Sequence, residues 1–109
     1  MEIFDVTTAA PYDSTRVVAQ PLATGEQGNV RIIRLSPGQV LPPHTHGASD
    51  LFLAVVEGAG VIETPDGPRP FEEGMLAQLA GTEELRVSNP GTTGLTLLAF
   101  LAPPFPPAR

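Results

Sequence analysis

The chain has 109 residues and a formal net charge of −6, because twelve Asp and Glu residues outweigh six basic residues, all of them Arg. This length suits one domain with one hydrophobic core, and the acidic balance argues against nucleic acid or an anionic membrane surface as a partner. The sequence has no Cys, which excludes disulfides and thiol chemistry. With neither a cationic leader nor a long apolar run, we expect a cytoplasmic protein.

Short runs rich in Val, Ile, Leu and Phe, each bounded by Gly or Pro, predict β-strands. In chain order, these runs are residues 30–35, 51–56, 60–64, 76–79, 85–88 and 94–101. A turn at residues 65–68 predicts a hairpin after the third run, and only residues 5–20 show a helical tendency, which Pro11 interrupts. Many short strands separated by turns predict an all-β sandwich or barrel.

The sequence has two histidines, His44 and His46, and they are two residues apart. On an extended backbone, residues with this spacing point to the same face, so both imidazoles could bind one ion. Imidazole nitrogen suits Zn, Fe, Ni, Cu and Mn. The alternative is a polar pair that hydrogen-bonds water or a small ligand.

The surroundings of the histidines resemble the first signature of the cupin superfamily, Gly-x5-His-x-His-x3-4-Glu-x6-Gly. The matching stretch is Gly38–Gly60, GQVLPPHTHGASDLFLAVVEGAG. The stretch Gly74–Asn89 is similar to the second cupin signature, with a turn near Gly81. The resemblance implies a cupin-type jelly-roll β-barrel, also called a double-stranded β-helix. It places the barrel at about residues 28–101 of a single domain spanning 1–109, between an N-terminal arm at 1–27 and a tail at 102–109.

The tail carries the run Pro103-Pro104-Phe105-Pro106-Pro107, the only biased segment of the chain. We expect a polyproline-like arm that lies on the domain or on a neighbouring subunit. The alternative is a ligand for an SH3-like module.

Two departures from the cupin signatures affect the implied metal site. Leu51 stands where the first signature places its Glu, and Asp50 can replace that ligand only if a β-bulge absorbs the extra residue before Gly58. Leu85 stands where the second signature places its His, and the adjacent Glu84 should face the other way by strand alternation. The resemblance therefore implies, as metal ligands, His44, His46 and Asp50, with Zn, Fe, Ni or Mn as the divalent transition metal.

If strand alternation follows the cupin pattern, apolar side chains line the barrel pocket. The predicted ligand-binding residues are Leu51, Leu53, Gln78 and Leu85, although Gln78 could instead face outward from its apolar run. Arg31 and Arg34 fall on opposite faces of their strand, so one of them could reach an anionic ligand. A dry interior of this kind suits a small, partly apolar ligand better than a sugar phosphate.

Three functions agree with these features, and the sequence leaves open whether the protein is an enzyme. The first is a small cupin that binds a small molecule, a divalent metal or both in its barrel. The second is a metal-dependent dioxygenase or isomerase that acts on a small organic substrate. The third is a non-catalytic structural or sensor module, and for any of them we expect a homodimer paired through its outer sheet.

Overall fold

The structure is a computed structural model that describes residues 1–107, and these residues form eight β-strands and no helix. The strands are β1 (Val18–Thr24), β2 (Asn29–Leu35), β3 (Asp50–Glu57), β4 (Ala59–Thr64), β5 (Gly67–Glu72), β6 (Leu76–Leu79), β7 (Val87–Ser88) and β8 (Leu95–Ala102). The all-β prediction is confirmed. Within residues 1–107, no helix is long and apolar enough to cross a membrane.

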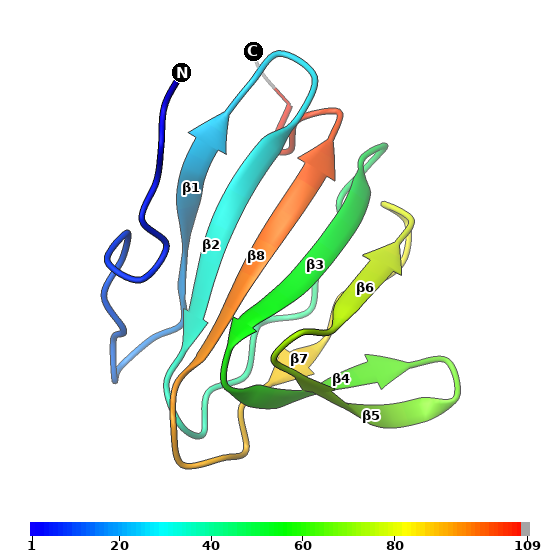
Figure 1. The fold of residues 1–109 in the computed structure, drawn as a ribbon. Helices are drawn as coiled ribbons and strands as arrows, with labels where there is room; N and C mark the ends of the chain where they lie inside the picture. The colour runs from blue at the N-terminus through cyan, green and yellow to red at the C-terminus, as the bar shows by residue number, and fades with distance from the viewer. Residues whose placement is uncertain (108–109) are drawn as a thin grey trace.

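The strands form two antiparallel sheets, which face each other across the core (Figure 1). The larger sheet has the order β1-β2-β8-β3-β6, and the smaller has the order β5-β4-β7. The predicted hairpin is β4–β5, which closes where Thr64 pairs with Gly67. Gly67 has a φ of 106°, a conformation that a residue with a Cβ rarely adopts.

The N-terminal region differs from its prediction. The helical tendency of residues 5–20 is wrong, because this segment forms turns and then enters β1 at Val18. The sequence does not predict β1, because Pro21 interrupts its strand pattern. In the structure, the pairing of β1 with β2 shifts between Pro21 and Ala23. β1 is an edge strand of its sheet, and an edge tolerates a proline that donates no ladder hydrogen bond.

The core lies between the two sheets and follows the period-2 alternation of the strands. On β3, Leu51, Leu53 and Val55 point inward and are almost fully buried. They meet side chains of β8 and of the smaller sheet, including Leu97 and Ile62. These residues form the barrel interior that the hydrophobic runs predict.

A second cluster covers the opposite, outer face of the larger sheet. Residues of the N-terminal segment, such as Ala10, pack there against Ile32 and Val18. Beside them, Arg34 is 3% exposed and donates to Thr96 Oγ1 over 2.7 Å and to the Val6 carbonyl over 2.6 Å. Arg34 therefore fastens the N-terminal segment to the sheet and is not free to bind a ligand.

Candidate functional site

The two histidines lie between β2 and β3, where backbone hydrogen bonds hold them against the segment that follows β6. The amide of Leu85 donates to the carbonyl of His44 over 2.9 Å, and the amide of His46 donates to the carbonyl of Gly81 over 2.7 Å. The two imidazole rings meet edge to face with their centroids 4.5 Å apart. The rings therefore lie side by side, as the spacing of the two residues predicts.

The two imidazoles have different surroundings. His44 is exposed, and its Nδ1 lies 2.8 Å from the carbonyl of Pro42. A carbonyl only accepts hydrogen bonds, so this contact places a proton on Nδ1 and leaves Nε2 with a free lone pair when the ring is neutral. His46 is 4% exposed, and its Nδ1 has no hydrogen-bond partner among residues 1–107.

His46 is held in its neutral form. Burial is the larger cause that lowers the pKa of His46 to about 4, and the neighbouring His44 is the smaller one. Desolvation disfavours a charged ring, and a second imidazole adds repulsion when it is protonated. At neutral pH, His46 can therefore donate one hydrogen bond and accept another, or supply a lone pair.

A cavity of about 180 Å³ adjoins the histidine pair at the end of the barrel. Its walls are mostly apolar, and its polar groups are the two imidazoles and the guanidinium of Arg31. The lining residues are Ala19, Arg31, Ile33, Leu41, His44, His46, Leu85, Ala99, Leu101, Phe105 and Pro106.

The segment after β8 closes this cavity. Phe105 contacts His46 edge to face, with 5.5 Å between ring centroids. The side chain of Asn29 binds the Phe105 backbone twice, as Nδ2 donates to the carbonyl over 2.8 Å and Oδ1 accepts from the amide over 2.9 Å. Ser49 Oγ donates to the carbonyl of Pro103 over 2.6 Å. Residues 103–107, here called the C-terminal strap, therefore lie on the domain at the histidine pair.

The structure does not bring Asp50 to the histidines. Asp50 is exposed on β3, next to the inward-facing Leu51, so alternation points it away from the barrel interior. β3 does contain a bulge, but it lies at the far end of the strand, between Val55 and Glu57. A bulge there leaves the direction of Asp50 unchanged.

Glu84 also lies away from the pair, since it is exposed and accepts a hydrogen bond from Arg86 Nε over 2.7 Å. Within residues 1–107, no three His, Cys, Asp or Glu side chains come close enough together to hold a metal ion. The residues present therefore do not fit a catalytic metal centre, which normally takes three protein ligands. Two buried leucines, Leu51 and Leu85, fill positions where the cupin signatures place ligands.

The four predicted ligand-binding residues fall in different places. Leu85 lines the histidine cavity, whereas Leu51 and Leu53 are fully buried in the core and are not part of its lining. Gln78 is exposed and pairs across the sheet with Phe52, so it faces outward, which is the alternative that the sequence allowed.

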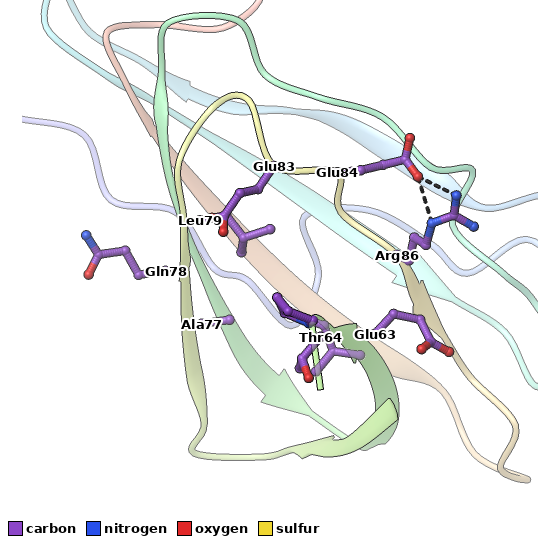
Figure 2. A pocket seen from close by; sticks show the side chains of 10 residues that line it. Glu63, Thr64, Ala77, Gln78, Leu79, Glu83, Glu84 and Arg86 are labelled. Atoms are coloured by element: carbon purple, nitrogen blue, oxygen red, sulfur yellow. Dashed lines mark hydrogen bonds and ion pairs between the residues drawn. The ribbon is translucent and has the colours of Figure 1, made fainter. Parts of the chain in front are cut away.

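A second cavity of about 380 Å³ lies between β6 and the smaller sheet. Ala77, Leu79 and Ile62 form its apolar floor, and Figure 2 shows the Glu84–Arg86 pair at its rim and Gln78 pointing away. Its charged side chains are exposed, and it contains no histidine. We take the smaller of these two cavities as the candidate site, because its apolar wall includes His46, a buried polar residue whose Nδ1 has no partner among residues 1–107.

Sequence reasoning singled out the histidines but missed Phe105 and Asn29. Arg31 was one of two arginines that could face a ligand, and its alternation with Ile33 on β2 turns it toward the cavity. The sequence does contain a signal for Phe105: it is the one aromatic residue in a proline-rich tail, and such a side chain is expected to pack on the domain.

Sequence comparison matches the chain to no protein-family model and to no curated protein. Solved structures do match its fold. The protein TT1209 from Thermus thermophilus is 27% identical with a TM-score of 0.86, and the match covers 95% of this chain and 99% of that one. An RmlC-like cupin from Desulfovibrio desulfuricans is 24% identical with a TM-score of 0.84, covering 96% and 99%.

An RmlC-like cupin family protein with a double-stranded β-helix fold from Methanocaldococcus jannaschii is 18% identical. Its TM-score is 0.74, and the match covers 94% of this chain and 91% of that one. These likenesses agree with the two facing sheets and with the signature residues around His44 and His46. The chain therefore shares the double-stranded β-helix fold of these cupins.

Proposed function

We propose that this protein binds a small organic molecule in the histidine cavity, without a metal ion. The observation that carries the proposal is His46 Nδ1, which is buried and has no hydrogen-bond partner among residues 1–107. A buried polar atom without a partner costs about 1–3 kcal/mol, and native proteins rarely leave one. The His46 ring also lines the adjoining cavity, so a ligand bound there, with a small turn of the ring, would supply the missing partner.

The size and walls of the cavity limit the ligand. Drug-sized ligands occupy pockets of roughly 300–1,000 Å³, so a cavity of about 180 Å³ suits a smaller molecule. The apolar walls, such as Leu101 and Phe105, favour an apolar body. The two imidazoles can hydrogen-bond a polar group at one end of that body.

A metal ion fits this cavity less well. Two imidazoles are the only described ligands within reach, and the positions that would complete the set carry leucine. A divalent ion held by two side chains would keep most of its charge in apolar surroundings, which is costly. We therefore expect protein purified without chelators or a nickel column to contain no more than trace transition metal by elemental analysis.

The binding test uses two neutral probes, isobutyramide and benzamide, added to the full chain and followed by NMR. We expect saturable shifts of the His46 ring and of the Leu85 and Leu101 methyls. Methyls of Ile62 and Leu79, in the second cavity, are the internal control and should not move. Shifts confined to the second cavity, no saturable shift with either the amides or the corresponding acids, or one equivalent of tightly bound metal would overturn the proposal.

A further inference from the structure

We infer that the histidine cavity is specific for a small organic carboxylate, whose head binds Arg31 and whose apolar body lies against Leu85, Leu101 and Phe105. This inference rests on the proposed function and names the chemical class of the ligand. It depends on the position of Arg31, on the charges around the cavity, and on the shape of the guanidinium group.

Arg31 faces the barrel interior from β2. It alternates with Ile33 and Leu35, which are buried in the main core, and it pairs across the sheet with Ala99, which also lines the cavity. Its side chain is half-buried, and its Nη2 donates to the carbonyl of Ala19 over 3.3 Å. This bond orients the guanidinium at the cavity wall and leaves Nε and Nη1 without a partner among residues 1–107.

The charges around Arg31 differ from those around most other arginines of the chain. Arg16, Arg34 and Arg86 each lie within 4 Å of a carboxylate, on Asp13, Glu57 and Glu84. Among residues 1–107, no carboxylate lies that close to Arg31, and no acidic side chain lines the cavity. In a chain with a net charge of −6, this leaves a cation facing an apolar space with no counter-ion among the described residues.

A carboxylate is the anion that suits these features. Nη2 keeps a second N–H beside the one it donates to Ala19, and together with Nε or Nη1 it presents two parallel donors that match the two carboxylate oxygens. His46, neutral at physiological pH, can donate a further hydrogen bond to the same head group. Phosphate carries more charge and would lose more hydration in a cavity with apolar walls, so we expect it to bind poorly.

Matched acid and amide pairs test the inference, because they have the same shape and differ in charge. The pairs are isobutyrate with isobutyramide and benzoate with benzamide, titrated into the full chain by calorimetry and NMR, with inorganic phosphate as a further probe. We expect each acid to bind at least tenfold more tightly than its amide, and phosphate to leave the His46 ring signals unchanged.

Substitution of the arginine gives the second arm. Arg31→Gln should abolish the preference for the acids, because acid affinity falls at least tenfold more than amide affinity, and Arg31→Lys should keep only part of the preference. Arg69→Gln, which removes an exposed arginine on β5, is the matched control and should bind like the wild type. NMR spectra of the free variants check that each is folded.

The outcomes separate the two proposals. If an amide binds in the cavity as tightly as its acid, or if Arg31→Gln retains the preference, the carboxylate inference fails and the proposed binding site stands. If phosphate binds there more tightly than the acids, the ligand class is also wrong. If neither acids nor amides bind in the cavity, the proposed function fails as well.

Discussion

At the scale of single residues, His46 is the group whose chemistry the fold changes most. Its ring is buried beside His44 and Phe105 and titrates with a pKa of about 4 instead of 6.5. Between these two values the unfolded chain binds a proton on this residue, and the folded chain does not. The free energy of unfolding therefore falls as the pH is lowered through this window.

We predict that this effect is visible as a difference between the wild type and His46→Gln. Between pH 7 and pH 4, the wild type should lose about 3 kcal/mol more of its free energy of unfolding than the variant, since one pKa unit corresponds to about 1.4 kcal/mol. Urea unfolding at several pH values measures the difference, and NMR titration of the ring gives the pKa directly. A ring that titrates near 6.5 in the folded protein contradicts the prediction.

Leu85 is the second informative residue, because it both fills the core and lines the cavity. It is 1% exposed, and its backbone pairs with His44. We predict that Leu85→Ala lowers the free energy of unfolding by about 2–5 kcal/mol, the usual cost of such a truncation in a core. Val40→Ala is the matched control: Val40 is 61% exposed, and the loss there should stay within about 0.5 kcal/mol. Equal losses at both sites would contradict the structure.

At the scale of elements, the C-terminal strap decides how far the site is shielded from water. It has no strand partner, and hydrogen bonds from Asn29 and Ser49 hold it in place. Such a segment depends on a few polar contacts and on the packing of Phe105. The strap can therefore detach more easily than any strand of the barrel.

We predict that a chain ending at Ala102 exposes the His46 ring and raises its pKa toward 6.5, because burial is the larger cause of the low value. NMR titration of the ring measures the change, and a chain ending at Pro107 is the control that keeps the strap. The barrel strands should persist in both chains. An unchanged pKa in the shorter chain would mean that the strap does not shield the histidine.

At the scale of the whole molecule, most of the fold could be predicted and only part of the site. The apolar runs located β3 and β8, and the histidine signature pointed to the barrel. Strand β1 could not be found, because Pro21 and a register shift break its pattern. Phe105 is held at the cavity by hydrogen bonds with Asn29, which is 76 residues away in sequence, and no local pattern encodes such a contact.

The outer face of the larger sheet carries the last prediction, the homodimer. Phe52 and Phe100 are paired across β3 and β8, and in the next row Ala54 pairs with Leu98 and Leu76. Phe100 is 40% exposed and Leu76 is 64% exposed. These five residues carry no charge, although the chain as a whole has a net charge of −6. Two acidic copies repel each other least when they meet through an uncharged face, and a two-fold dimer brings the same face of each copy together. Exposed apolar patches also mark interaction surfaces.

We therefore predict that the wild type sediments as a dimer at micromolar concentration and that Phe100→Glu converts it to a monomer. A glutamate at this position would lose its hydration in the apolar interface, which is costly for a charged group. Val40→Glu is the control, because Val40 is 61% exposed but bridges to Ser88 of the smaller sheet, so that variant should stay dimeric. A monomeric wild type, or a Phe100→Glu protein that remains dimeric and folded, would show that this face is not the interface.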